Sequence, residues 1–572
     1  MPGVISPGEF PNEPIFVQLL KVSGEVSHVI VQDPQTDIQA NYGQFLADLL
    51  QTRKGLRESI PESILDRNSL LRDDKPYIFL LTDGNYNFVV GAFSILSVGG
   101  AFVPLSTKVL PEEALHFSRQ CKSAVILTSR EYLPLAREVQ RYATAQGIEW
   151  TVVEICIKAS PSLDLSASPL RIDESATIPP RRPGMVLFTS GTSGPPKGVV
   201  HSRSIFYEAH TRSSPSQVSL SHRHHLWIGG AMPMIRLPLA GARLEVINPD
   251  AGVLWERLRE GGVTILTGTP RLWSQMMEYF QTRLQSLPLS ELEVYISGAR
   301  ELRVAHVGGG IPHRSLLRFW RENLRRPLTV EYGATELGGL GLKCTPNTPI
   351  DIERCIGRPH PKIAVRLSDG NHGELQIKSA NLFSHYLGDE AATKAAFTED
   401  GYYKTGDVAH VVGDDYVFDG RLSTEFTKFR GWQISILEVE LRLLELPFIR
   451  EGCILGAPDP NNGTRLAALV RFTRPNTISV CACTNELQPS LRSLRESLAV
   501  DLPVYMLPTA LRVLGDEEEI PRTASHKVIR SKAIEQYFQL TDSGEIVESA
   551  ELWDLDTNES LGPRKIWDWG GL

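Results

Sequence analysis

Residues 188–198 read Phe-Thr-Ser-Gly-Thr-Ser-Gly-Pro-Pro-Lys-Gly, which places hydroxyl groups, glycines and a lysine side by side. Glycine lets backbone N–H groups turn toward an anion, hydroxyls donate to phosphate oxygens, and lysine adds a compact positive charge. The run is not the Walker loop, because Pro196 precedes Lys197 and Gly198 follows it. An ordinary surface loop can have this composition, but the apolar stretch 185–188 indicates a strand end before it. The sequence therefore predicts a polyphosphate loop made of Thr189, Ser190, Gly191, Thr192, Ser193, Gly194 and Lys197.

Downstream motifs could complete a nucleotide site. The run Gly308-Gly309-Gly310 allows close backbone approach to a flat ring, and the ring of Tyr332 can stack on a base. Glu336 offers the oxygen ligand that Mg²⁺ prefers, and Asp407 could accept two ribose hydroxyls. Taken singly, each feature has an ordinary alternative, such as a tight turn or a solvated carboxylate. A lysine in a late loop, such as Lys527, is usually a solvated surface charge.

The size and composition exclude some classes of protein. A chain of 572 residues exceeds a single compact core, so we expect two or more domains. The formal net charge of −8 argues against a protein that binds nucleic acid through a basic field. The seven cysteines include no C-x-x-C pair, which favours a reducing compartment.

One uncharged stretch, 88–105, is long enough for a membrane span. Three glycines and a proline interrupt it, so we predict a buried helix at about 88–98 followed by a strand at about 101–104. The first fourteen residues lack the features of a secretory signal, and the last three are not the peroxisomal S-K-L address. These features favour a cytoplasmic protein without a membrane span.

Short apolar runs alternate with amphipathic segments through the first two thirds of the chain. Such alternation is typical of α/β layers around largely parallel sheets. Amphipathic helices are expected at 112–120 and 254–260, and a Ser- and Pro-rich loop at 160–183 precedes the phosphate run. The expected strands are 77–81, 124–127, 151–153, 185–188, 243–246, 264–267 and 329–331.

The pattern changes near residue 362. Short strands at 365–367, 374–377, 409–412 and 416–418 alternate with turn signals, which indicates a small antiparallel, β-barrel-like unit. A further region begins near Gly420 and has expected elements at 437–446, 452–456, 467–472 and 491–501. We therefore predict an N-terminal domain over 1–420, with the β-rich unit at about 362–420. An α+β C-terminal domain over 421–540 follows a hinge near 421–427, and a tail covers 541–572.

Considered jointly and in this order, the motifs resemble the adenylate-forming superfamily: acyl- and aryl-CoA synthetases, non-ribosomal peptide adenylation domains and luciferases. The resemblance covers about residues 30–540 and rests above all on 189–198, 332–336, 403–407 and 521–528. It implies a large N-terminal domain of layered α/β subdomains and a small mobile C-terminal domain. It also implies that a carboxylic acid reacts with ATP to an acyl-adenylate and pyrophosphate, and that the acyl group then passes to a thiol.

The resemblance also implies roles for single residues. The phosphate run would hold the β- and γ-phosphates, with Mg²⁺ near Thr189 and Glu336, and Tyr332 would stack on adenine. Asp407 and Arg421 would fix the ribose. Further nucleotide-binding residues would be Gly308, Gly309, Gly310, Gly333, Ala334, Thr335 and Lys428.

Three residues would carry the chemistry: Lys527, Lys197 and Glu336. Lys527 would bridge the carboxylate and α-phosphate oxygens during adenylation, and a lysine suits this role as a point charge. Rotation of the C-terminal domain would then withdraw Lys527 to admit the thiol. Gly310 would border the acid as well as the nucleotide.

The chain departs from the family pattern near the end. His526 stands where the family usually has glycine before the catalytic lysine, and its β-carbon could restrict the loop. Glu425 stands where the family often has an Asp or Lys hinge residue. The spacing from Gly420 to Lys428 is one residue longer than in many members and resembles the malonyl-CoA synthetase branch.

The histidine run at 221–225 could suggest zinc, but no suitably spaced cysteine or acidic partner accompanies it. By the resemblance, His225 lies near a histidine that lines the acyl pocket. Arg236, in the apolar stretch 228–239, could pair with a second carboxylate on the substrate. More commonly such an arginine extends from a helix to water.

The leading hypothesis is therefore a cytoplasmic acyl-CoA ligase that uses ATP, Mg²⁺ and CoA on a small-molecule carboxylic acid. One alternative is a stand-alone adenylation enzyme that loads the phosphopantetheine of a separate carrier protein. Another is a catalytically impaired nucleotide-binding relative, which the histidine at position 526 favours mildly.

Overall fold

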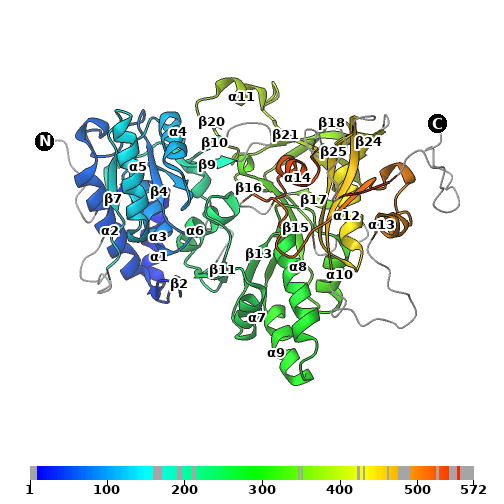
Figure 1. The fold of residues 1–572 in the computed structure, drawn as a ribbon. Helices are drawn as coiled ribbons and strands as arrows, with labels where there is room; N and C mark the ends of the chain where they lie inside the picture. The colour runs from blue at the N-terminus through cyan, green and yellow to red at the C-terminus, as the bar shows by residue number, and fades with distance from the viewer. Residues whose placement is uncertain are drawn as a thin grey trace.

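The computed structural model describes residues 9–158, 170–189, 196–208, 214–345, 348, 352–421, 426–429, 432–459, 463–473, 490–523, 527–539 and 550–553. Figure 1 shows layered sheets and helices in a large N-terminal part, with a smaller group of strands and helices formed by the C-terminal residues. The predicted α/β class with a large N-terminal domain is confirmed.

The first layer is a seven-stranded sheet flanked by helices. Strands β4, β5 and β6 pair in parallel, as expected for alternating strands and helices. The sheet order is β20 (His385–Tyr386), β10 (Lys197–Ser202), β9 (Pro183–Thr189), β5 (Ala101–Leu105), β4 (Tyr77–Leu81), β6 (Val125–Thr128) and β7 (Thr151–Glu154). Its helices are α2 (Tyr42–Ser59), α3 (Tyr86–Ser97), α4 (Pro111–Cys121) and α5 (Leu133–Ala145).

Helix α3 is the apolar segment that could have been a membrane span. Every residue of the helix except Asn87 is buried, as expected for a helix that is apolar on all sides. It leads into β5, so the predicted buried helix and strand are confirmed. Across the described ranges, the structure has no helix with the length and hydropathy needed to cross a bilayer.

The second layer is a 13-stranded sheet that combines parallel and antiparallel pairing. Its parallel part contains β2 (Val31–Asp33), β12 (Arg243–Val246), β11 (Val218–Ser221), β13 (Ile265–Gly268), β14 (Val304–Gly308) and β15 (Thr329–Ala334). The edge strand β3 (Ile38–Ala40) pairs antiparallel with β2. The helices of this layer are α6 (Ile228–Ala240), α7 (Ala251–Arg259), α8 (Pro270–Tyr279), α9 (Leu289–Arg300) and α10 (Arg314–Glu322).

The β-rich unit expected near 362–420 continues this sheet through hydrogen bonds. Strand β15 turns into antiparallel β16 (Gly339–Lys343), which pairs with β17 (Cys355–Pro359), and β17 pairs with β22. The remaining strands are β18 (Ala364–Asp369), β19 (His372–Lys378), β21 (Tyr403–Val412) and β22 (Asp415–Arg421), and helix α11 (Glu390–Ala395) follows β20. Strands β14, β15, β21 and β22 therefore belong to one hydrogen-bonded sheet.

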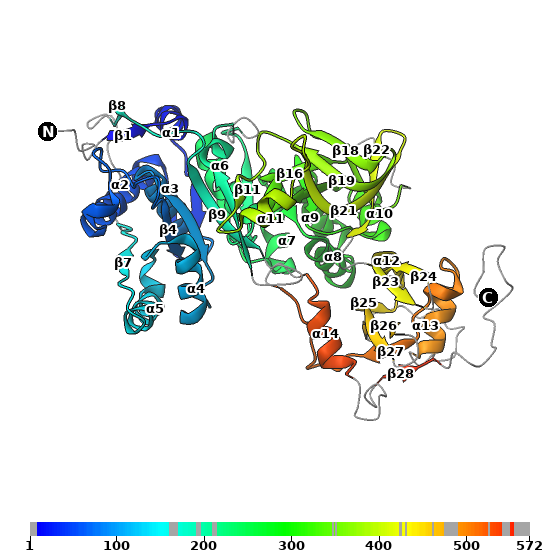
Figure 2. The same cartoon turned by 90° about the horizontal axis from the view of Figure 1, so that it is seen from above.

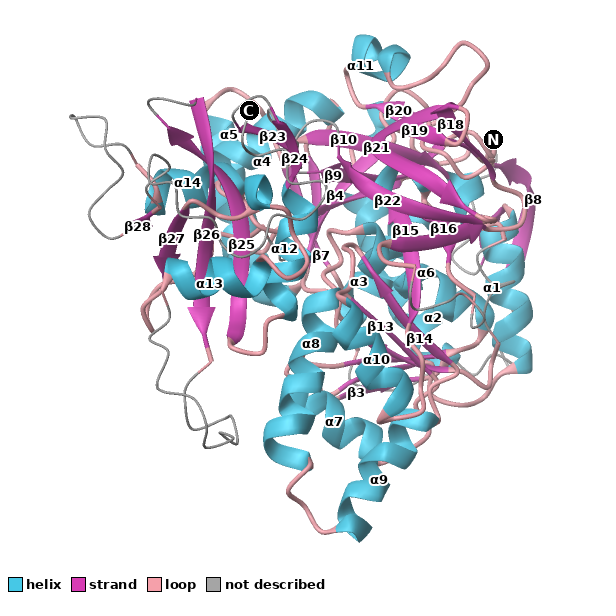
Figure 3. Ribbon diagram, turned by 90° about the vertical axis from the view of Figure 1, so that its right-hand side faces the viewer, coloured by secondary structure: helices cyan, strands magenta, loops and turns pink. Residues whose placement is uncertain are grey.

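The C-terminal elements have a core of their own, built from α12, α13 and strands of a four-stranded sheet. Figures 2 and 3 show this group beside the large N-terminal part. It contains β23 (Phe426–Phe429), β24 (Trp432–Ser435), α12 (Ile436–Glu445), β25 (Ile449–Asp459), β26 (Gly463–Phe472), α13 (Leu491–Leu498), β27 (Ala510–Val513) and α14 (Arg530–Tyr537). The expected hinge residue Glu425 and His526 lie outside the described residues.

Two segments differ from the sequence-based expectation. The loop expected at 160–183 contains β8 (Arg171–Thr177), which pairs in parallel with β1 (Glu9–Asn12). The tail contributes β28 (Glu551–Leu552), which completes the four-stranded sheet. Both strands are short and polar, and the partner of β8 lies far away in the sequence, so neither has the periodicity that marks a strand locally.

A buried ion pair ties the N-terminal segment to the end of the phosphate hairpin. Glu13 precedes α1 (Pro14–Glu25), and Arg203 follows β10; both side chains are fully buried. Arg203 Nε and Nη2 donate to the two Glu13 carboxylate oxygens, each at 2.6 Å. Arg203 also donates to the carbonyls of Gly100 and Leu96. The guanidinium therefore joins three segments within the first layer.

Candidate active site

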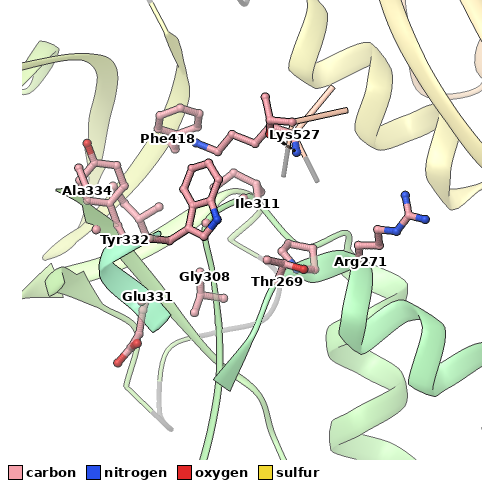
Figure 4. Close-up of a pocket in the computed structure, with 18 of the residues that line it drawn as sticks. Thr269, Arg271, Gly308, Ile311, Glu331, Tyr332, Ala334, Phe418 and Lys527 are labelled. Carbon is pink, nitrogen blue, oxygen red and sulfur yellow. Dashed lines mark hydrogen bonds between the residues drawn. The ribbon is translucent and has the colours of Figure 1, made fainter. Parts of the chain in front are cut away.

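A cleft of about 3050 Å³ runs between the large N-terminal part and the C-terminal elements. Figure 4 gives a close-up of its lining. Among the described residues, the predicted site residues that line it are Thr189, Lys197, Gly308, Gly309, Gly310, Tyr332, Gly333, Ala334, Thr335, Glu336, Asp407, Arg421 and Lys527. Segments more than 300 positions apart in the sequence thus meet around one cavity.

The two ends of the phosphate run belong to paired antiparallel strands. Thr189 ends β9 and lies opposite Lys197, the first residue of β10. The Thr189 hydroxyl donates to the Lys197 carbonyl at 3.4 Å. Ser190, Gly191, Thr192, Ser193 and Gly194 lie outside the described residues. The hairpin therefore presents a hydroxyl and an ammonium group at the edge of the cleft.

Tyr386 connects this hairpin to Glu336, although no sequence motif singled it out. Its hydroxyl donates to Glu336 Oε1 at 3.1 Å, and Lys197 Nζ lies 5.3 Å from its ring centroid. Tyr386 is on β20, which pairs with β10 at Val199. Two protein oxygens, from Thr189 and Glu336, fit Mg²⁺, because that ion takes few protein ligands and fills its shell with phosphate oxygens and water.

Tyr332 and Asp407 are hydrogen-bonded to each other. The Tyr332 hydroxyl donates to Asp407 Oδ2 at 2.6 Å, and Arg421 Nε donates to Asp407 Oδ1 at 2.6 Å. Burial and the Asp407 carboxylate raise the pKa of Tyr332 well above its ordinary value, so the phenol stays protonated. Burial alone would lower the pKa of Arg421, but Asp407 raises it. The trio therefore presents a fixed acceptor beside an aromatic ring.

Lys527 enters the cleft from the C-terminal elements. A short hairpin holds it: the Thr523 amide donates to the Lys527 carbonyl at 2.8 Å, and the Lys527 amide donates to Thr523 Oγ1 at 3.2 Å. In Figure 4 it lies above Ile311, with Tyr332 on one side and Arg271 on the other. Its side chain is exposed to the cavity, so a ligand could contact it.

Ion pairs join the C-terminal elements to α8 along this cleft. Glu451 contacts Arg271 of α8 at 3.4 Å and Arg522 at 3.1 Å. Arg450 contacts Glu278, also on α8, at 3.4 Å. The side chains of the two pairs with α8 are at least a quarter exposed, so these pairs contribute little to holding the two parts together.

The structure does not bring His225 into the described lining, and the side chain of Lys428 lies outside what the structure describes. His225 is buried against Phe88, and burial lowers its pKa to about 3, so the ring is neutral. It is not one of the residues that line the cleft, although Arg223 and Trp227 on either side of it are. Lys428 lies on β23, where its backbone pairs with Gln433. Within the described ranges, no group of histidine, cysteine and acidic side chains could hold a metal by itself.

Charged side chains gather at the end of the cleft beside α6, and the sequence indicated only Arg236 among them. His306 Nδ1 lies 2.7 Å from Glu331 Oε1, and Lys343 Nζ lies 3.1 Å from His306 Nε2. Arg223 and Arg236 line the same region. Burial alone would raise the pKa of Glu331, but His306, Lys343 and Arg236 lower it below its ordinary value. A carboxylate surrounded by cations is thus part of the cleft wall.

Comparison with known proteins identifies the family. A family model described as AMP-binding enzyme matches residues 65–387. The acyl-CoA ligase oryP of Aspergillus oryzae is 32% identical, over 97% of this chain and 100% of its own length. The mitochondrial malonate–CoA ligase ACSF3 of Homo sapiens is 25% identical, over 82% of this chain and 84% of its own length.

A solved structure has the same fold. The o-succinylbenzoate CoA synthetase MenE from Bacillus subtilis, in complex with its acyl-adenylate intermediate, superposes with a TM-score of 0.70 at 19% identity. The match covers 90% of this chain and 97% of that one. The chain therefore belongs to the AMP-binding enzymes, as an AMP-forming ligase of the acyl-CoA synthetase kind.

Proposed function

We propose that this ligase activates its acid at the cleft between the two parts of the chain and transfers the acyl group to CoA. The observation that best supports this assignment is the convergence of Lys197, Glu336, the Tyr332–Asp407 pair and Lys527 around one cavity. Each of these groups comes from a different segment, and each has a chemistry that one part of ATP or of the reacting carboxylate requires.

The barrier to adenylation is the approach of a carboxylate to an anionic α-phosphate. Catalysis then depends on alignment and on neutralisation of charge. Lys527 supplies a positive charge to the carboxylate and α-phosphate oxygens. Thr189 and Lys197 hold the β- and γ-phosphates, so that pyrophosphate leaves in line with the attack. Asp407 accepts hydrogen bonds from the ribose, and adenine stacks on Tyr332 beside the backbone of 308–310.

Mg²⁺ bound by Glu336 and Thr189 would neutralise phosphate charge during this step. Neighbouring residues orient the Glu336 carboxylate. Tyr386 donates to one oxygen of Glu336 and so leaves the other to face the cleft. Lys197, over the ring of the same tyrosine, lies near that carboxylate without forming an ion pair with it among the described contacts.

We further propose that residues 421–540 form a domain, and that its rotation withdraws Lys527 from the reacting centre and admits the thiol. The separate core of these elements supports a unit that moves as one body, and its exposed ion pairs with α8 can break and re-form at little cost. Rotation of a rigid domain about a few hinge residues is common in enzymes.

We also propose that the protein acts in the cytoplasm.

Pyrophosphate exchange tests the function. The full chain, with ATP, Mg²⁺ and a panel of carboxylic acids, should exchange labelled pyrophosphate into ATP only when a suitable acid is present. Addition of CoA should then yield AMP and the thioester. If the acyl group passed to a carrier protein but not to CoA, the carrier protein would be the acceptor. ATP binding without exchange for any acid would indicate a catalytically impaired relative.

Replacing Lys197 by alanine should weaken the use of ATP whatever acid is offered, because the side chain contacts phosphate and not the acid. We expect a fall in kcat/KM for ATP of about 30-fold, the loss of a charge-assisted contact of about 2 kcal/mol. Thr189→Ala should give a smaller fall of the same kind. Lys108→Ala, an exposed lysine outside the cleft, is the matched control. A defect confined to certain acids would mean that this hairpin contacts the acid and not the phosphates.

A further inference from the structure

The end of the cleft beside α6 carries more positive than negative charge. Three permanent cations line it, Arg223, Arg236 and Lys343, against one carboxylate, Glu331. His306 lies between Lys343 and Glu331 and bridges them through its two ring nitrogens. An unbranched fatty acid needs only an apolar wall, so this charge has no use in binding its chain.

The sheet register explains how these groups meet. Glu331 on β15 lies opposite Gly308 of β14 and opposite Lys343 of β16. His306 is two positions before Gly308, so its side chain is on the same face of the sheet. Glu331, Lys343 and His306 therefore share the face of the sheet from which Gly308 borders the cleft. Arg223 connects this set to the glycine run, because a Cβ at Gly309 would lie 3.7 Å from its Nη2.

Arg223 is the group whose charge is least satisfied. It lines the cleft and is largely shielded from solvent, yet no hydrogen bond or ion pair joins its guanidinium to another residue of the described ranges. The guanidinium packs against glycines: a Cβ at Gly229 would lie 2.6 Å from Arg223 Cζ, and one at Gly309 would lie 3.7 Å from Nη2. A shielded guanidinium without a partner is costly, and an anionic ligand would relieve that cost.

Glu331 does not provide that partner. Its carboxylate is engaged by His306 at 2.7 Å, with Lys343 at 3.9 Å, and it influences Arg223 only through the field of its charge. The cleft lining in the same stretch of chain, between Arg223 and Arg236, includes Trp227, Ile228 and Met232, which suit a carbon skeleton. The pocket thus combines an apolar wall with an anion-binding end.

We propose that the acyl pocket binds a second carboxylate of the substrate, that Arg223 is its main contact, and that Arg236 and Lys343 add to the positive field. The inference rests on the proposed function, because it places the acid in this cleft. The preferred substrate is then a dicarboxylic acid activated at one end. A guanidinium suits this role, since its planar fork can hold both oxygens of a carboxylate.

The test compares acids that differ only in the second charge. The full enzyme is given each straight-chain dicarboxylic acid from three to eight carbons, its monomethyl ester and the monocarboxylic acid of the same length. Pyrophosphate exchange gives kcat/KM for each. We expect the best dicarboxylic acid to exceed its monoester by at least about 30-fold, the usual loss when a desolvated charge pair loses one partner.

Two variants test the assignment to Arg223. Arg223→Met keeps most of the stem and removes the charge; it should lower kcat/KM for the dicarboxylic acid by at least about 30-fold and leave the monoester and KM for ATP unchanged. Gly229→Ala adds one carbon that must displace the guanidinium, and it should act in the same direction with less risk to folding. Arg259→Met, an exposed arginine of α7 outside the cleft, is the matched control.

A third variant should act in the opposite direction. Glu331→Gln removes the only carboxylate of the charged set, and we expect KM for the dicarboxylic acid to fall while the monoester is unaffected. Equal or better activation of monoesters and monocarboxylic acids by the unmodified enzyme would overturn the second-carboxylate site and leave the ligase function intact. Exchange with none of the acids would count against the proposed function itself.

Discussion

Replacing Lys527 by alanine is expected to slow acyl-adenylate formation by about 10²–10³-fold, the range found when one preorganised charge-stabilising group is removed from an active site. The reason is that Lys527 is a cation that the C-terminal elements bring into the cleft near Tyr332, where the carboxylate and the α-phosphate are proposed to react. Single-turnover measurement of adenylate formation reports this loss directly. Thioester formation from a supplied acyl-adenylate and CoA should stay near the unmodified rate, because the second step does not use this lysine.

The control for this prediction is Lys532→Ala. Lys532 is exposed on α14, in the same group of elements, and does not line the cleft. It should leave both half-reactions unchanged. If Lys527→Ala slowed both half-reactions equally, Lys527 would have no specific role in adenylation.

Replacing Glu13 by alanine is expected to lower the free energy of unfolding of the N-terminal part by about 3–5 kcal/mol, the usual cost of breaking a buried ion pair. Arg203 would keep its charge in a fully buried position and lose both of its 2.6 Å contacts with the carboxylate. The urea midpoint of the unfolding transition, followed by tryptophan fluorescence, measures the loss. Because the chain has more than one core, the transition is compared at its midpoint for each variant.

Two further variants complete this test. Glu25→Ala removes an exposed carboxylate from the helix that follows Glu13 and should change stability by no more than about 0.5 kcal/mol. Glu13→Leu combined with Arg203→Met replaces the pair by apolar groups and should recover most of the loss, since such replacements are often neutral. A midpoint for Glu13→Ala as high as that of Glu25→Ala would mean that the pair contributes nothing.

Much of the fold follows from local patterns in the sequence. The strands expected at 77–81 and 243–246 coincide with β4 and β12, and the helix expected at 112–120 is one residue shorter at each end than α4. Periodicity and turn residues carry this information locally. The join of the β-rich unit to the parallel sheet could not be predicted in this way, because β16, β17 and β22 pair across distant parts of the chain.

The candidate site, like the fold, could be predicted only in part from the sequence. Glycine runs and the motifs around Tyr332, Asp407 and Lys527 are short, and their residue types indicate phosphate, ribose or charge chemistry by themselves. Tyr386, His306 and Lys343 have no such signal, because isolated aromatic, histidine and lysine residues are common in any chain. The pairing of β10 with β20, of β14 with β15 and of β15 with β16 brings them beside the motif residues.

The shared sheet has a consequence for nucleotide binding. Strands β14, β15, β21 and β22 carry Gly308, Tyr332, Asp407 and Arg421 within one ladder of backbone hydrogen bonds. To widen or narrow the space for base and sugar, the protein would have to break part of that ladder. On the proposed binding mode, the space for base and sugar is therefore set when the chain folds, and nucleotide binding should require little rearrangement of these strands during turnover.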